Sequence, residues 1–307
     1  MSESSSKAPS ETLDQYGVIG HPVEHSWSPF IHGQFARQTG QALAYRLHDV
    51  PPERFRVHVA DFAEHGGRGL NVTVPHKLAA ARLSSELTGR AQRAGAVNTL
   101  VLEADRILGD NTDGAGLVRD LVSNLGLELA DRRILIAGAG GAARGVLSPL
   151  LALGPAQILV AARVAARARS LVDEFAVPGH KLAGCGFEEL PRERFDLVLN
   201  ATSASLNGQV PALSQAVIGP ATLCYDMAYA RTDTAFVRWA RERGCERAVQ
   251  GWGMLVEQAA ESFQLWRGIR PDTAPVLAQL TAGRRGSGGG GGGGGAGGAG
   301  AARATRA

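Results

Sequence analysis

The sequence predicts an α/β protein built from two domains, and three observations support that prediction. The chain has 307 residues, which is enough for two domains of ordinary size. Segments with strand and helix character alternate along it, as they do in sheets covered by helices. The alternation restarts at residue 132, where an apolar strand runs into a glycine-rich turn and a helix.

The first half of the chain contains three predicted strand and helix pairs and then a hairpin. The strands are expected at 16–20, 42–50 and 68–74, and the helices at 28–40, 52–66 and 75–84. Pro29 at the first helical position and Gly40 beyond the last bound the first of these helices. Residues 96–114 are typical of a β-hairpin that ends in a loop, with Ala104 and Asp105 near its turn.

The second half repeats the strand and helix pattern without any internal sequence repeat. Residues 132–154 predict a strand, a glycine turn and a helix. Further strands are expected at 157–163, 195–203 and 222–229, and further helices at 165–176, 232–244 and 253–268.

The charge of the chain is concentrated in one terminal segment. The formal net charge is +3, but residues 283–307 contain four arginines and no acid, which leaves −1 for the rest. The pI near 9.0 therefore does not indicate a nucleic-acid surface on the folded body. We expect residues 283–307, which are rich in glycine, and the polar residues 1–13 to be disordered, because neither segment can bury enough apolar surface.

The cysteines and the N-terminal sequence indicate a reducing compartment. Cys185, Cys224 and Cys245 show no CxxC spacing, which argues against a disulfide framework and offers no metal site. The first fourteen residues contain no apolar signal region, and no run of about 18 apolar residues occurs. We therefore expect a cytoplasmic protein with no membrane partner.

A glycine-rich fingerprint joins the first strand of the second half to its helix. It consists of Gly138, Ala139, Gly140, Gly141, Ala142 and Ala143, which satisfy G-x-G-x-x-G/A between a strand and a helix. Gly138 permits the tight turn, Gly140 lets the backbone approach a pyrophosphate, and Ala143 is small enough for close packing of helix on strand. The helix N-terminus would hold the negative charge. The alternative is a glycine turn in a domain that binds no nucleotide.

The residues after the next strand predict NADP rather than NAD. Sites that prefer NAD usually place Asp or Glu about 20 residues after the first glycine. Here Arg163 and Arg167 occur instead, and no carboxylate lies between Gly138 and Asp173. A planar, permanently charged guanidinium suits the 2′-phosphate of NADP. The alternative is two solvated arginines at the start of a helix.

Two polar segments of the first half suggest a binding site for a small acid. Residues 20–29 place Ser26 and Ser28 two apart before a helix, and residues 71–77 end a strand with Lys77. In open α/β sheets ligands bind outside the carboxyl ends of the strands. Two hydroxyls could hold a carboxylate, and the lysine could transfer a proton. Helix capping by either serine and a surface lysine are the alternatives.

Eight motifs along the chain resemble those of the shikimate dehydrogenases. They are HSWSP, NVTVPHK, GAVNTL, NTDG, GAGGAARG, NATS, YDMAY and GMLVEQAA, in the order seen in that family. The resemblance covers roughly residues 16–281. Several of these motifs are specific to the family, unlike the glycine fingerprint. The resemblance implies an oxidoreductase of aromatic amino acid biosynthesis that reversibly reduces 3-dehydroshikimate to shikimate with NADPH.

The resemblance also implies a role for each matching residue. Lys77 and Asp113 would form the catalytic dyad that moves a proton on or off the C3 oxygen. Asn98 and Gln258 would bind ring hydroxyls. The substrate residues implied are Ser26, Ser28, Thr73, Lys77, Asn98, Asp113, Tyr229 and Gln258. The cofactor residues implied are Gly138, Ala139, Gly140, Gly141, Ala142, Arg163, Arg167, Thr202, Met227 and Gly251, of which the last three would line the nicotinamide side.

The chain departs from the family pattern at two places. Residues 162–164 are Ala-Arg-Val where Asn-Arg-Thr is common, so two hydrogen-bonding side chains near the adenosine phosphate are lost while both arginines stay. NADP preference is still expected, with a weakened affinity for NADP or a weakened discrimination against NAD. Residues 204–205 are Ala-Ser where Ser-Gly often occurs, which alters a loop near the nicotinamide.

The fold expected is a Rossmann-type NADP-binding domain at 114–251 and a discontinuous substrate-binding domain with a mostly parallel sheet. The second would comprise 14–113 and 252–282, with a small-molecule substrate in the cleft between the two domains. We expect a monomer or a homodimer without a nucleic-acid partner. Three alternatives stay open. The first is an enzyme that acts on quinate or aminoshikimate, and the second is a catalytically inactive ligand sensor, which would lack Lys77 or Asp113. The third is an RNA-binding protein that uses residues 283–307.

Overall fold

The computed structural model describes residues 13–282, except 177 and 180. The disorder expected for the two ends falls on residues outside this range, apart from residue 13. None of the helices in the described range is long and apolar enough to cross a membrane. Cys185, Cys224 and Cys245 are free thiols, and the last two are buried.

The first sheet is mixed and has the strand order β2-β1-β3-β5-β6-β4. Its strands are β1 (Asp14–Gly20), β2 (Leu43–Asp49), β3 (Gly67–Val72), β4 (Glu86–Leu87), β5 (Thr99–Leu102) and β6 (Ile107–Asp110). β1 pairs in parallel with both β2 and β3, whereas β5 and β6 form the predicted antiparallel hairpin. The helices of this half are α1 (Ser28–Thr39), α2 (Phe55–Glu64), α3 (Lys77–Leu83) and α4 (Gly89–Ala94).

The second sheet is entirely parallel and has the order β12-β11-β10-β7-β8-β9. Its strands are β7 (Arg133–Ala137), β8 (Gln157–Ala162), β9 (Leu182–Gly186), β10 (Leu197–Asn200), β11 (Leu223–Asp226) and β12 (Arg247–Gln250). The helices of this half are α6 (Gly141–Leu151), α7 (Ala165–Phe175) and α8 (Ala235–Glu242). Numbered within the sheet, the order is that of a Rossmann fold, which confirms the predicted fold class.

The sequence patterns missed the two edge strands of the second sheet. β9 has the sequence LAGCG and β12 the sequence RAVQ. Neither segment contains the run of bulky apolar residues that made the central strands visible, because an edge strand pairs on one side only. Short 3₁₀ turns fill several connections, at Pro52–Arg54, Phe187–Glu189, Ala204–Asn207 and Gln215–Val217.

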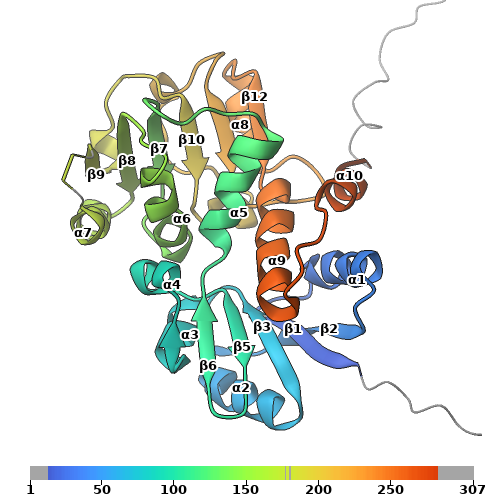
Figure 1. Ribbon diagram of the computed structural model, residues 1–307. Coiled ribbons are helices and arrows are strands. Elements are labelled where there is room, and N and C mark those ends of the chain that lie inside the picture. Colours follow the sequence, from blue (N-terminus) through green and yellow to red (C-terminus); the bar gives the residue numbers. More distant parts are fainter. Residues whose placement is uncertain (1–12, 177, 180, 283–307) are drawn as a thin grey trace, which may run out of the picture.

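Two helices, α5 (Asp113–Arg119) and α9 (Trp252–Arg267), lie side by side between the two sheets (Figure 1). The C-terminal helices α9 and α10 (Ala274–Ala282) pack on α1 of the first half. Phe35 of α1 and Phe263 of α9 are fully buried in that contact. The chain therefore returns to its first sheet after it has completed the second.

Helix α5 was not predicted, since two glycines in its first turns hide its helical pattern. A Cβ atom on Gly114 would lie 2.5 Å from the carbonyl oxygen of Gly145 in α6. A Cβ atom on Gly116 would lie 2.6 Å from the backbone nitrogen of Gln258 in α9. Both glycines thus permit backbone contact with the neighbouring helices. A π-helical turn at Asp120–Asn124 continues the helix.

We predict that Gly116→Ala destabilises the protein, because the added methyl group must displace backbone at the α5–α9 contact. Overpacking of this kind costs about 1–3 kcal/mol of unfolding free energy. Urea unfolding measures the effect. The control is Gly33→Ala in α1, where a Cβ would meet only the end of the Arg37 side chain at 3.9 Å. That change should be neutral or stabilise the helix by up to about 1 kcal/mol; equal losses from both variants would contradict the packing argument.

Candidate active site

A lysine and an aspartate meet at the starts of two helices. Lys77 begins α3 just beyond β3, and Asp113 begins α5 just beyond β6. The Lys77 Nζ lies 2.5 Å from the Asp113 Oδ2, with side chains that are 21% and 8% exposed. This pair is therefore mostly shielded from water while it stays open on one side, which suits a group that exchanges protons with a bound molecule.

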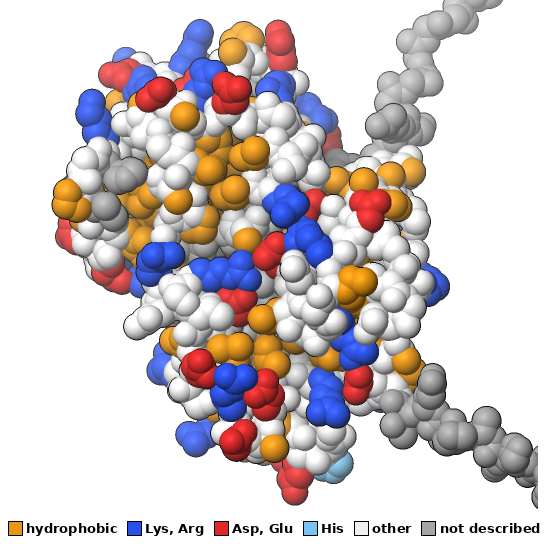
Figure 2. All heavy atoms as spheres, viewed as in Figure 1, with side chains coloured by type: hydrophobic (Ala, Val, Ile, Leu, Met, Phe, Trp, Pro, Cys, Tyr) orange, Lys and Arg blue, Asp and Glu red, His pale blue; other side chains and the backbone are white. Residues whose placement is uncertain are grey.

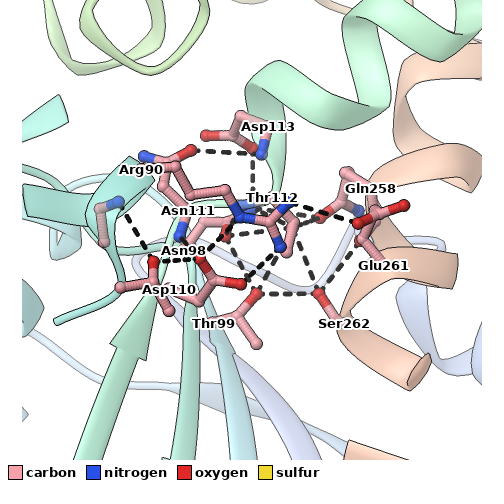
Figure 3. Close-up of polar contacts among 12 residues, drawn as sticks. Arg90, Asn98, Thr99, Asp110, Asn111, Thr112, Asp113, Gln258, Glu261 and Ser262 are labelled. Atoms are coloured by element: carbon pink, nitrogen blue, oxygen red, sulfur yellow. Dashed lines mark hydrogen bonds and ion pairs between the residues drawn. The ribbon is translucent and has the colours of Figure 1, made fainter. Parts of the chain in front are cut away.

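Asn98 connects the aspartate to helix α9 (Figure 3). Its Nδ2 donates to Asp113 Oδ1 at 2.9 Å and to Gln258 Oε1 at 3.2 Å. Its Oδ1 accepts the backbone N–H of Thr112 at 2.8 Å, which fixes the orientation of the amide. Four of the predicted site residues, Lys77, Asn98, Asp113 and Gln258, are thus brought together in one chain of hydrogen bonds.

A layer of buried polar side chains between the first sheet and α9 supports this chain of hydrogen bonds. Asn71 of β3 and Thr99 of β5 both bond the Ser262 hydroxyl of α9, at 2.9 and 2.8 Å. The Ser262 hydroxyl also donates to the Gln258 carbonyl, one turn earlier, at 3.1 Å. Polar groups buried in this way cost free energy unless they are paired, and each of these is paired. The layer holds α9, and with it Gln258, in register with the first sheet.

A cluster of hydroxyl groups lies at the start of α1. The Ser26 Oγ donates to the Ser28 Oγ at 3.1 Å and accepts the Ser28 N–H at 3.3 Å. Trp27 occupies the N-cap position of α1, and no side chain caps the helix there. Ser26 accepts the first N–H of the helix, that of Ser28, but the Ser28 hydroxyl has no capping role. Burial raises the pKa of Tyr229 to about 12, although a hydrogen bond with Ser26 opposes the shift. Three predicted residues, Ser26, Ser28 and Tyr229, therefore meet in a neutral cradle.

Tyr45 belongs to the same cradle and was missed by sequence reasoning. Its hydroxyl donates to Asn71 Oδ1 at 2.7 Å. Burial raises its pKa well above the usual value, and a hydrogen bond with Ser28 opposes that shift. Nothing in the sequence marks it, since an aromatic residue in a strand is ordinary sheet composition. Thr73, a predicted residue, follows β3, and its backbone N–H bonds the Ile19 carbonyl of β1 at 2.9 Å.

The glycine fingerprint lies where the order of the second sheet reverses, between β7 and β10. Gly138 has φ of 112°, and a Cβ there would lie 3.0 Å from the Ala201 carbonyl oxygen. At Gly140 and Gly141, by contrast, a Cβ would meet no other part of the protein within 4 Å, apart from the adjoining backbone. Helix α6 begins at Gly141 and directs its unpaired N–H groups toward this open space.

The rest of the fingerprint and the nicotinamide-side residues surround the same turn. Ala139 and Ala142 are partly buried against the core of the second sheet. Thr202 follows β10, with its methyl group 3.2 Å from a built Cβ on Gly138. A Cβ on Gly251 would lie 2.6 Å from the Met227 carbonyl oxygen, so these two backbones touch. Thr202 is therefore next to the fingerprint, and Met227 is next to Gly251.

Two exposed arginines lie beyond the end of β8. Arg163 and Arg167 are exposed and form no ion pair with any described residue. Arg169 of the same helix does, since it pairs with Glu189 at 2.8 Å. Between the first two, Val164 is 52% exposed and caps α7 without a side-chain bond. The valine therefore leaves the helix start uncapped while the arginines remain available to an anion.

Asp226, at the end of β11, organises the loop that follows β10. Its Oδ2 accepts the Ser205 hydroxyl at 2.6 Å, and its Oδ1 accepts the Asn200 amide at 3.0 Å. The Thr202 hydroxyl in turn donates to Asn200 Oδ1 at 2.6 Å. Burial raises the pKa of Asp226, and the Ser205 hydrogen bond opposes that shift. Ser205, one of the two departures from the family pattern, thus ties its loop to a buried carboxyl group.

An arginine cluster ties the two halves together away from the cradle. Figure 2 shows Lys and Arg side chains gathered at the waist between the halves. Arg90 bonds Asp110 through Nε and Nη2 at 2.7 and 2.5 Å. Burial opposes ionisation of Asp110, but the Arg90 bonds outweigh it and lower the pKa of that carboxyl. Arg144 of α6 bonds the Ala94 carbonyl of α4 at 2.9 Å. The Arg90 bonds hold α4 against β6 within the first half, and the Arg144 bond holds α4 against α6 of the second half.

The cradle opens into a groove of about 700 Å³ between the two halves. One wall is the loop that follows β1, including Ser26 and Trp27, and the other is the loop that follows β11, including Tyr229 and Arg231. No group of three or more His, Cys, Asp or Glu side chains among the described residues could hold a metal ion.

Three family profiles match successive parts of the chain. Residues 18–100 match a shikimate dehydrogenase substrate binding domain. Residues 120–216 match a profile described as shikimate / quinate 5-dehydrogenase. Residues 251–281 match a shikimate 5′-dehydrogenase C-terminal domain.

Individual proteins are similar over nearly the whole described range. The shikimate dehydrogenase (NADP(+)) of Methylococcus capsulatus is 55% identical over 273 residues, which is 89% of this chain and 98% of that protein. The crystal structure of an Ael1 enzyme from Pseudomonas putida is 46% identical, with a TM-score of 0.81 over 87% of this chain and 98% of that one. The shikimate 5-dehydrogenase of Thermus thermophilus, solved with NADP(H) and shikimate, is 30% identical, with a TM-score of 0.77 over 88% of this chain and 100% of that one.

Proposed function

This chain belongs to the shikimate dehydrogenase family, and from that premise we propose that it reversibly reduces 3-dehydroshikimate to shikimate with NADPH. It is an oxidoreductase that acts on a CH–OH group, in the pathway that leads through chorismate to the aromatic amino acids. The observation that supports this most directly is the hydrogen-bonded chain of Lys77, Asp113, Asn98 and Gln258 beside a hydroxyl cradle. A silent sensor on the same scaffold would have no need of the first two.

The nucleotide residues fit NADP. The open space around Gly140 and Gly141 admits a pyrophosphate to the N-terminus of α6. Arg163 and Arg167 would hold the 2′-phosphate, and Thr202, Met227 and Gly251 would line the nicotinamide side. When bound, NADPH supplies the hydride that converts the ketone to an alcohol.

The substrate residues suit an anionic polyol. Ser26, Ser28, Thr73 and Tyr229 would bind its carboxylate with hydroxyl groups, and Tyr45 joins them in this proposal. The amides of Asn98 and Gln258 would bind the ring hydroxyls. Hydrogen-bonding groups of this kind replace the water that a polyol loses on binding, which an apolar pocket could not do.

Lys77 and Asp113 would handle the proton of the reaction. Reduction of the ketone develops negative charge on its C3 oxygen, which a nearby ammonium group stabilises. Lys77 would donate a proton to that oxygen in the direction of shikimate and accept it in reverse. Asp113, fixed by Asn98 on its other oxygen, would keep Lys77 Nζ directed at the reacting atom.

The domain boundaries, location and partners are further parts of the proposal. Residues 14–113 and 252–282 would form the substrate domain, in agreement with the packing of α9 and α10 on α1, and residues 114–251 the NADP domain. Closure of the groove between them would exclude water. We place the enzyme in the cytoplasm, as a monomer or homodimer without nucleic-acid or membrane partners.

The test of the proposed function is turnover by the purified protein, followed by absorbance at 340 nm. Shikimate and quinate are each offered with NADP and with NAD. Fast turnover with shikimate and NADP alone is the expected result. Equal efficiency with quinate or NAD would retain the reaction but remove the specificity, and no turnover with any pair would refute the proposal.

Lys77→Ala should lower kcat by roughly two to four orders of magnitude with a modest change in KM, because a proton-transfer group acts mainly in the transition state. Steady-state kinetics with shikimate and NADP measures both constants. Lys181→Ala, which removes an exposed lysine before β9, is the matched control and should leave both unchanged. An unchanged kcat for Lys77→Ala would remove this residue from the catalytic dyad.

Arg163→Ala should raise KM for NADP about tenfold and KM for NAD little, since the lost contact is to the 2′-phosphate alone. The measurement is the KM for each nucleotide at saturating shikimate. Arg169→Ala on the same helix, whose guanidinium already pairs with Glu189, serves as the control. If both nucleotides were affected equally, Arg163 would not be the 2′-phosphate ligand.

A further inference from the structure

Arg231 lies at the rim of the groove, two residues beyond Tyr229 of the hydroxyl cradle. Its guanidinium carbon lies 5.3 Å from the centre of the Trp27 ring, on the opposite wall. Trp27 is itself the residue between Ser26 and Ser28. The arginine of one half therefore reaches over the groove to the loop of the other half that contains the two serines.

A series of aromatic contacts supports the Trp27 ring that faces the guanidinium. The Trp27 ring contacts the ring of Trp252 edge-on, with centres 5.8 Å apart, and Trp252 contacts Tyr229 at 4.8 Å. Trp252 is buried in the interior, so the aromatic contacts hold the Trp27 ring in a fixed position. A cation held over an aromatic face loses less freedom when it binds an anion than a freely rotating side chain does.

The charge of Arg231 is available to a ligand. Arg231 is exposed and forms no ion pair with any residue that the structure describes. Arg238, which also lines the groove, instead donates to the backbone carbonyl of Asp233. Two acids line the groove as well, Glu24 and Asp233, and the second is paired with Arg241.

The cradle itself offers hydrogen bonds but no net positive charge. Ser26, Ser28, Tyr45 and Tyr229 are uncharged near neutral pH, and Lys77 is balanced by Asp113. A carboxylate held only by neutral hydroxyls keeps an uncompensated negative charge. Such a cradle discriminates only weakly between a carboxylate and a neutral group of the same shape.

We propose that Arg231 is a specificity-determining residue that pairs with the carboxylate of the substrate at the mouth of the groove and selects anionic over neutral ring polyols. The inference rests on the proposed function, which supplies the anionic substrate. The hydroxyl cradle then orients the carboxylate, while the arginine provides the charge that attracts it.

The test compares Arg231→Gln with the unmodified protein in steady-state kinetics at low and high ionic strength. KM for shikimate should rise about five- to tenfold at low salt, the loss expected when one charge-assisted bond at a solvent-exposed rim is removed. The difference should shrink at high salt, because exposed charges are screened. KM for NADP and kcat should change little, and Arg231→Lys should recover most of the loss.

Arg243→Gln is the matched control. The guanidinium carbon of Arg243, which follows α8, lies 5.3 Å from the centre of the Trp239 ring, and Arg243 does not line the groove. Its removal should leave KM for shikimate unchanged at every salt concentration.

Three results would overturn the inference. The first is an Arg231→Gln variant with the shikimate KM of the unmodified protein. The second is an equal rise in KM for shikimate and NADP, which would make Arg231 a structural clasp between the halves. The third needs no variant: a shikimate KM of the unmodified protein that does not depend on ionic strength. If the unmodified protein turns over no shikimate at all, the proposed function fails and the inference falls with it.

Discussion

The contact of helix α5 with its neighbours through bare backbone is the constraint on which the rest of the structure depends. Gly114 brings α5 against α6 of the second sheet, and Gly116 brings it against α9, which packs on the first half. Because any side chain at these positions would separate the helices, the spacing of the two sheets follows from the glycines. Asp113 begins this helix, so the position of the reactive carboxylate is set by the same contact.

The polar groups around that carboxylate form a continuous buried layer rather than isolated pairs. Asn98 bonds Gln258 of α9, and Asn71 and Thr99 of the first sheet both bond Ser262 of the same helix. A buried polar network is stable only when every member is satisfied, so the layer admits one arrangement of strands and helix. The rigid base it provides explains how Gln258, on a helix from the end of the chain, can share a site with residues from the beginning.

Sequence reasoning recovered the parts of the fold that local patterns encode. The central strands were visible as apolar runs, and the β5–β6 hairpin as two such runs around Ala104 and Asp105. Helix α5 and the edge strands β9 and β12 were not, because packing between distant segments decides them. Within the site, motifs identified Lys77, Asn98 and Asp113 as candidates, whereas Tyr45 and Asp226 emerged only from contacts to Asn71 and Ser205 made across the fold.

The packing of α9 on α1 has a consequence for how the protein is made. The apolar face of α1, with Ile31 and Phe35, is buried against Val256 and Phe263. About 220 residues separate the two partners along the chain, so roughly 10 to 45 s of ribosomal synthesis pass before the second can arrive. During that interval the apolar face of α1 in the nascent first half lacks the partner that buries it. The order in which the two helices are translated therefore leaves the apolar face of α1 without its native partner until α9 has been made.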